Sequence, residues 1–116
     1  MQDNMPKKND SWRAQLKKGT LELAVLGVLS AHRCYGLELL ERLNLLDLQV
    51  SDGSIYPLLA RLRTEGKVTA EWVDKGSGHA HKYYTLTPHG VQVLKDMIED
   101  WREYTVAINR AIGERK

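Results

Sequence analysis

The sequence has only one cysteine, Cys34, among its 116 residues. A single thiol can form neither an internal disulfide nor a thiolate zinc cluster, which fits a reducing compartment. Long apolar runs are also lacking, because Glu22 interrupts the longest one, Leu21–Leu29. A helix that crosses a bilayer needs about 20 apolar residues, and residues 1–11 lack the apolar segment of a secretory signal. These absences predict a cytoplasmic protein with no membrane partner.

Motifs of catalysis and metal binding are missing as well. The chain has no glycine-rich nucleotide loop, no nucleophile motif and no carboxylate pair with identifiable partners, so neither an enzyme nor a cofactor is predicted. His79 and His81 would share one face of a strand, but a metal site needs at least three ligands. Because only His32 and His89 remain as further histidines, no metal site is predicted.

The net charge of +2 is too small to identify a nucleic-acid-binding protein. Its distribution is uneven, since basic residues outnumber acidic ones in residues 1–18 and 60–82, and acidic residues prevail in residues 19–59. A fold that brought the two basic segments together would create a phosphate-binding surface. Charge alone favours an ordinary solvated surface.

Apolar residues at helical spacing predict three helices between Trp12 and Leu46. A short amphipathic helix is predicted over Trp12–Lys18, after a polar tail. A core helix is predicted over Thr20–Ala31, with Thr20 as its N-cap. Another helix is predicted over Gly36–Leu46, after a short break. Its inward stripe is predicted to be Leu37, Leu40 and Leu43, with Leu39 and Leu46 alongside.

The next helix is predicted to begin after Ser51 or Ser54 and to end near Thr64, with Gly66 as the capping residue. Pro57 lies in the first turn if Ser54 is the cap, and deeper in the helix if Ser51 is the cap. The sequence leaves both alternatives open. The inward residues are predicted to be Ile55, Leu58, Leu59 and Leu62.

The apolar period then changes from helical to alternating. Residues 68–73 and 82–86 predict two strands joined by a glycine-rich turn, and Trp72 and Tyr84 are predicted to pack within the hairpin and core. Thr87 and Pro88 predict the start of a long helix that ends near Ile112. The predicted fold class is therefore mostly α with a small β-hairpin, a winged helix-turn-helix plus a long C-terminal dimerisation helix. The predicted domains are residues 1–18 (tail and short helix), 19–87 (winged helix) and 88–116 (dimerisation helix).

The last helix carries apolar residues spaced alternately three and four apart, which is a heptad seam. Such a seam is too apolar to stay exposed on a monomer. It could pack on its own winged domain, but the length of the helix favours a homodimer. The predicted dimerisation residues are Val91, Leu94, Ile98, Trp101, Thr105, Ile108 and Ile112.

Several stretches in this order resemble the PadR-like transcriptional regulators, in their short form with one C-terminal helix. The matching stretches are Lys18-Gly19-Thr20-Leu21-Glu22-Leu23, Tyr35-Gly36-Leu37-Glu38-Leu39, Gly53-Ser54-Ile55-Tyr56-Pro57-Leu58-Leu59-Ala60-Arg61-Leu62, Glu65-Gly66-Lys67-Val68 and Lys82-Tyr83-Tyr84-Thr85-Leu86-Thr87-Pro88-His89-Gly90. The resemblance implies a homodimeric repressor whose third helix enters the major groove of duplex DNA and whose wing touches the adjacent backbone. It also implies a small aromatic effector, for which Trp101 at the dimer interface is the candidate contact.

The chain departs from the family pattern in two places. Residues 44–50 form a shorter link between the second and third helices than is usual. The wing carries Gly78-His79-Ala80-His81-Lys82 where the family has a Gly-Arg-x-Arg/Lys run, which implies weaker or pH-dependent contact with phosphates. An alternative function is therefore a winged-helix protein-interaction module that has lost DNA binding and acts through its dimer helix.

The DNA-contact candidates come from the third helix, over residues 52–65, and from the wing, over residues 74–82. Hydroxyls and backbone N–H groups at a helix N-terminus can reach phosphates or base edges, and Arg61 suits a phosphate. Tyr56 could instead pack on a neighbouring helix, and Cys34 is predicted to be a small buried residue and not a redox sensor. The candidates are Ser51, Ser54, Tyr56, Pro57, Arg61, Lys75, His79, His81 and Lys82.

Overall fold

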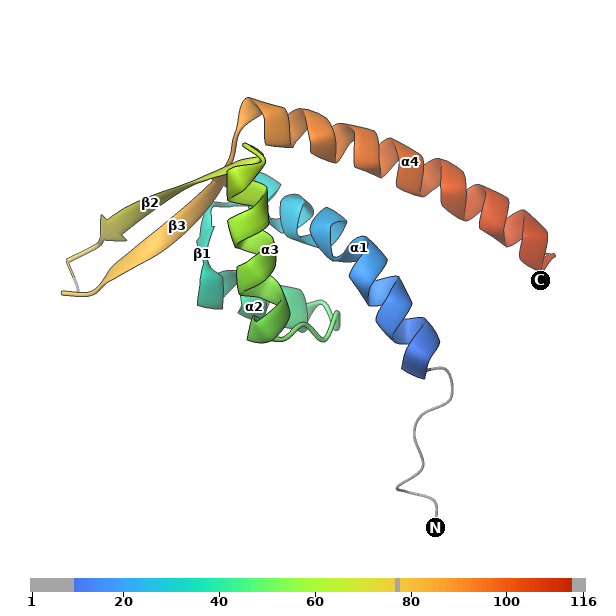
Figure 1. Cartoon of the computed structure of the whole chain (residues 1–116), viewed down its shortest axis with the longest axis horizontal. Helices are drawn as coiled ribbons and strands as arrows, with labels where there is room; N and C mark the ends of the chain where they lie inside the picture. Colours follow the sequence, from blue (N-terminus) through green and yellow to red (C-terminus); the bar gives the residue numbers. More distant parts are fainter. Residues whose placement is uncertain (1–9, 77, 114–116) are drawn as a thin grey trace, which may run out of the picture.

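The computed structural model describes residues 10–76 and 78–113. Within these residues three helices precede a hairpin and a long final helix, so the predicted mostly α architecture with a small hairpin is confirmed (Figure 1). The predicted tail over residues 1–9 lies outside the described residues. In chain order the elements are α1 (Asp10–Ala31), β1 (Cys34–Tyr35), α2 (Gly36–Leu45), α3 (Asp52–Thr64), β2 (Val68–Asp74), β3 (Ala80–Leu86) and α4 (Pro88–Ile112).

Helix α1 is one continuous helix where two were predicted. Thr20 lies in its interior and donates its Oγ1 hydroxyl to the Leu16 carbonyl at 2.8 Å, so the prediction of an N-cap at Thr20 was wrong. Gly19 lowers helix stability by only about 1 kcal/mol relative to alanine. Packing of the second half of α1 on the core outweighs that cost, since Val25 and Leu26 are fully buried.

Helix α2 turns only part of its predicted stripe inward. Leu39 and Leu43 are fully buried, whereas Leu37 and Leu46 are 51% and 62% exposed, so the predicted places of Leu37 and Leu46 were wrong. The buried stripe starts at Gly36, because the ring of Tyr56 lies directly against that glycine. Residues three and seven positions after Gly36 then point toward the core.

The sheet has three antiparallel strands in the order β1-β3-β2. The sequence analysis did not predict strand β1, because two residues are too few to show an alternating apolar pattern. The hairpin extends away from the helices (Figure 1). Val68 and Tyr84 lie on one face of the hairpin and are buried in the core. Trp72 lies on the same face but is 68% exposed, so the prediction that Trp72 packs was wrong.

Helix α4 begins where it was predicted to begin. The Thr87 hydroxyl oxygen accepts the Gly90 N–H at 2.9 Å and its O–H donates to the Gly66 carbonyl at 2.7 Å, which ties the start of α4 to the end of α3. A Cβ at Gly90 would collide with the Lys67 carbonyl, so this close approach requires glycine. At its other end Gly113 adopts a φ of 96°. In the described part of the chain, no helix has the length and apolarity needed to cross a membrane.

Candidate nucleic-acid interface

Helix α3 is capped by Ser51. The backbone N–H groups of Ser54 and Ile55 both donate to the Ser51 carbonyl, at 3.0 and 3.1 Å, which decides between the two caps that the sequence left open. Pro57 is therefore inside the helix, and it leaves the Gly53 carbonyl without the usual intrahelical donor. The helix nevertheless continues unbroken to Thr64.

The short link between α2 and α3 is held by one side chain. Asn44 accepts the Val50 N–H at 2.6 Å through Oδ1 and donates Nδ2 to the Val50 carbonyl at 3.0 Å. Asp47 and Gln49 adopt φ values of 63° and 53°, which reverse the chain within few residues. The link therefore fixes where α3 starts.

The outward face of α3 is small and uncharged along its centre. The four residues predicted to face inward, Ile55, Leu58, Leu59 and Leu62, are all buried. Helix geometry then places the opposite strip at positions spaced three and four apart. This strip, which we call the central strip, consists of the exposed residues Gly53, Pro57, Ala60 and Thr64.

Two different flanks border the central strip. Ser54 and Arg61 lie on the flank next to α1, and Tyr56 and Arg63 lie on the flank next to the hairpin. Tyr56 is 46% exposed although its ring packs on Gly36, where an added Cβ would stand 2.7 Å from the tyrosine hydroxyl. Tyr56 therefore meets both interpretations of the sequence, because it packs on α2 and also presents surface to solvent.

Arg61 is engaged in an ion-pair network. Its guanidinium donates to Glu22 of α1 at 2.9 Å and to Glu65 at 3.0 Å. Lys67 completes the network, since its ammonium lies 2.8 Å from a carboxylate oxygen of each of these two residues. The network joins α1, the end of α3 and the start of β2.

The network sets the ionisation of its members. Burial would raise the pKa of Glu22, but the hydrogen bonds from Lys67 and Arg61 outweigh burial and hold that pKa below its ordinary value. The hydrogen bond to Glu22, followed by that to Glu65, raises the pKa of Lys67. Two carboxylates thus neutralise the two cations, so Arg61 retains little net positive charge to attract a phosphate.

Arg63 is a candidate that the sequence analysis missed. It is exposed, and it forms no ion pair within the part of the chain that the structure describes. Burial raises the pKa of Tyr84, and the charge of nearby Arg63 opposes that rise, which places Arg63 beside the hairpin. Its spacing of seven residues from Tyr56, which is two helical turns, could have identified it.

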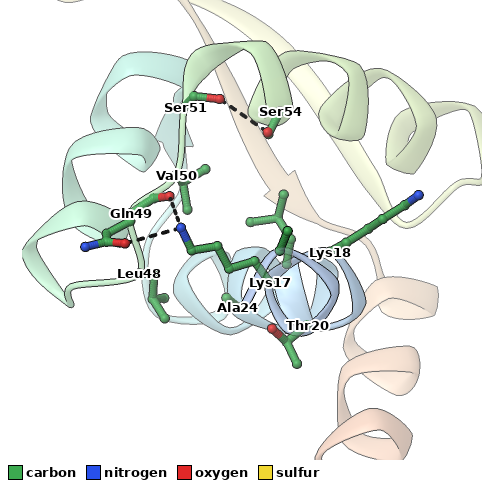
Figure 2. Close-up of a pocket in the computed structure, with 11 residues that line it drawn as sticks. Lys17, Lys18, Thr20, Ala24, Leu48, Gln49, Val50, Ser51 and Ser54 are labelled. Carbon is green, nitrogen blue, oxygen red and sulfur yellow. Dashed lines mark hydrogen bonds between the residues drawn. The ribbon is translucent and has the colours of Figure 1, made fainter. Parts of the chain in front are cut away.

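A cavity of about 590 Å³ lies between α1 and the start of α3 (Figure 2). The Ser51 and Ser54 hydroxyls, 3.3 Å apart, border it on the α3 side. On the α1 side, Lys17 donates its ammonium to the Gln49 carbonyl at 3.4 Å and to the Gln49 side chain at 3.3 Å. Figure 2 shows the Lys18 side chain reaching away from Gln49, along α3. Lys17 and Lys18 of the basic N-terminal segment therefore lie beside the start of the third helix.

The wing residues are divided between the two faces of the hairpin. His81 stacks on Tyr35 of β1 with ring centroids 4.1 Å apart, and Lys75 lies 4.9 Å from the centroid of the Tyr83 ring. Lys82 lies on the other face, with its ammonium 5.9 Å from the Trp72 ring. His79 is exposed in the segment between the strands. The structure thus places His81 in an aromatic cluster that connects the wing to β1.

The family model described as the transcriptional regulator PadR-like family matches residues 25–96. The chain belongs to the PadR-like family of transcriptional regulators. It is therefore a regulator that binds DNA and not an enzyme, as predicted. Two solved structures of PadR-like proteins share this fold. One from Bacillus cereus is 33% identical with a TM-score of 0.78, over 84% of this chain and 96% of the other. One from Eggerthella lenta is 29% identical with a TM-score of 0.80, over 88% and 89% of the two chains.

Helix α4 of this PadR-like regulator has two unlike halves. In the first half Leu94 belongs to the core of its own chain, with Ile98 packed against that core. In the second half Trp101 and Ile108 are 44% and 40% exposed. Figure 1 shows this half running beyond the sheet, on the same side as the N-terminal half of α1. The remaining predicted seam residues are the exposed Val91 and Ile112 and the half-buried Thr105.

Cys34 of the regulator is fully buried, and burial raises the pKa of its thiol. Its Sγ lies 3.5 Å from the His32 carbonyl. A protonated thiol without solvent access is a packing residue and not a reactive group. Among residues 10–76 and 78–113, no group of three or more His, Cys, Asp or Glu side chains could hold a metal ion.

Proposed function

We propose that this regulator is a homodimeric, sequence-specific repressor that acts in the cytoplasm, with α3 in the major groove of duplex DNA. The observation that carries the proposal is the central strip of α3, which is small, exposed and uncharged. Small side chains let a helix approach the base edges closely, and the methyl groups of Ala60 and Thr64 suit contact with thymine methyls. Tyr56, which is 46% exposed, borders this strip.

The basic groups around the central strip suit phosphate contacts. Arg63 lies on one flank without an ion pair, and Lys18 lies on the other. The free N–H groups at the start of α3, next to Ser51 and Ser54, add partial positive charge. Phosphate contacts on both flanks would fix the register of the helix in the groove.

In this arrangement Arg61 positions α3 and does not bind DNA. Both of its terminal nitrogens already donate to carboxylates. In the wing, Lys75 and His81 hold the hairpin through Tyr83 and Tyr35, and Lys75 adds positive charge near the backbone. Lys82 has no ion pair in the described residues, so its ammonium is available to a phosphate.

The dimer would form through the second half of α4. Its exposed Trp101 and Ile108 continue the seam beyond the core, and α1 adds exposed Trp12 and Leu16. A two-fold axis through these helices would present two copies of α3 to half-sites about 34–36 Å apart. A small aromatic effector that stacks on Trp101 stays a prediction, resting on the exposure of that ring.

The test is sedimentation equilibrium of the wild type, Ile108→Glu and the adjacent control Asn109→Glu. The wild type and the control are expected to be dimers, and Ile108→Glu a folded monomer with weaker duplex binding. A dimeric Ile108→Glu protein would contradict this interface. A stable dimer that binds no duplex would favour the alternative, a protein-interaction module.

A further inference from the structure

The cavity between α1 and the start of α3 has the size of a small-molecule site. Its volume of about 590 Å³ falls within the range of about 300–1,000 Å³ that is typical of such sites. Its apolar lining consists of Ala14, Leu21, Ala24, Leu48 and Val50. Leu21, Ala24 and Val50 pack against the core, so the cavity reaches the edge of the hydrophobic interior.

The polar lining of the cavity carries positive charge without negative charge. Lys17 and Lys18 are its charged residues, and no carboxylate is among the described residues that line it. The Lys17 ammonium has no ion pair in the described residues and is hydrogen-bonded to two neutral oxygens of Gln49, at 3.3 and 3.4 Å. Hydrogen bonds between an ammonium and a carboxylate are shorter, at about 2.7–2.9 Å. A carboxylate would therefore be a stronger partner for Lys17 than Gln49 is.

The lining suits an aliphatic ligand and not a flat aromatic one. No aromatic ring is among the described residues that line the cavity, so a ligand ring would find nothing to stack on. Methyl and methylene groups beside a cation match a hydrocarbon chain that ends in a carboxylate. Figure 2 shows Lys17 reaching from α1 to Gln49 while Lys18 points away, so Lys17 is the group placed to bind the carboxylate.

We propose that this cavity binds a medium-chain fatty acid, with the carboxylate on Lys17 and the chain against Leu21, Leu48 and Val50. Binding takes the Lys17 ammonium away from Gln49, which lies two residues before the Ser51 cap of α3. It also brings a negative charge next to the start of α3, where that charge repels phosphates. This second step rests on the proposed function, because it needs a duplex bound at α3. The fatty acid is then an effector that weakens DNA binding.

The experiment titrates the full-length protein with octanoate by isothermal titration calorimetry, with octanamide as the neutral counterpart. The wild type should bind octanoate, and it should bind octanamide about tenfold more weakly. Lys17→Gln should likewise bind octanoate about tenfold more weakly than the wild type does. The control Arg13→Gln removes a positive charge from the same helix outside the cavity, so its affinity should be unchanged.

A second pair of variants tests the apolar lining. Leu48→Glu puts a negative charge inside the cavity and should abolish octanoate binding, whereas Leu46→Glu lies in the same link outside the cavity and should bind as the wild type does. Both leucines are exposed, so thermal unfolding should show that both variants are folded. At constant ionic strength, saturating octanoate should weaken duplex binding of the wild type about tenfold and leave that of Leu48→Glu unchanged.

Absence of octanoate binding to the wild type, or equal binding of octanoate and octanamide, would overturn the proposed site. Unchanged octanoate binding by Leu48→Glu would place the ligand elsewhere and overturn it as well. Octanoate binding by a protein that binds no duplex would uphold the site and contradict the proposed function. Duplex binding that does not respond to saturating octanoate would uphold the proposed function and overturn the effector role.

Discussion

Arg61 and Arg63 lie two residues apart on one helix, and their surroundings differ. Arg61 is paired with Glu22 and Glu65, whereas Arg63 has no ion pair in the described residues. We therefore predict that Arg61→Met lowers stability without changing the salt dependence of DNA binding. Arg63→Met should change the salt dependence and leave stability unchanged.

The magnitudes follow from exposure. The Arg61 side chain is 49% exposed and Glu22 only 18%, so solvent screens the pair in part. A partly screened ion pair of this kind contributes up to about 1 kcal/mol, and its loss should lower the melting temperature by up to about 4 °C. Glu22 keeps Lys67 as a partner at 2.8 Å, so it is not left as an unpaired buried charge.

The assay combines urea unfolding with fluorescence anisotropy on duplex DNA across a salt series. Each phosphate contact adds about 0.9 to the slope of log affinity against log salt, so Arg63→Met should flatten the slope by about 1 per subunit. A flattened slope in Arg61→Met, with unchanged stability, would refute the positioning role. It would show that Arg61 leaves its carboxylates to bind phosphate.

Three further predictions concern stability and reactivity. The lowered pKa of Glu22 stabilises the folded protein above the ordinary pKa of 4.5, and this stabilisation is lost as the pH falls through the pKa of Glu22 in the folded state. In urea titrations between pH 6 and 3, the wild type should therefore lose more unfolding free energy than Glu22→Gln. Gly90→Ala should destabilise the protein by about 2 kcal/mol or more, because the added Cβ would collide with the Lys67 backbone carbonyl. Gly19 has open space around it, so Gly19→Ala should stabilise the protein by about 0.5–1 kcal/mol in the same assay. Cys34 should react with a thiol reagent only at the rate of unfolding, and rapid reaction of the native protein would contradict its burial.

Much of the fold could be predicted from the sequence because local rules decide it. Local signals include the alternation in residues 68–73, the N-cap Thr87 and the helix-ending Gly66. Each of them determines a strand or a helix end through residues that are close in the sequence. The errors came where tertiary contacts decide. The short helix Trp12–Lys18 joined the core helix because packing further along α1 outweighs Gly19, and Leu37 turned outward because Tyr56 rests on Gly36.

The candidate site was predicted less completely than the fold. The third helix and its inward face followed from spacing alone. The partners of Arg61 lie on α1 and at the end of α3, and an ion pair with Glu22, 39 residues away, has no local pattern. Trp72 was expected to pack because tryptophans usually do, and only the register of the hairpin shows that it lies beyond the core.

The central claim is that α3 and its flanks bind duplex DNA with sequence preference. The most direct measurement is fluorescence anisotropy of the wild-type protein with duplex from upstream of its own gene, against scrambled duplex, across a salt series. The account predicts tight binding that favours the native duplex and weakens steeply as salt rises. Equal binding to both duplexes, or none to either at low salt, would contradict it.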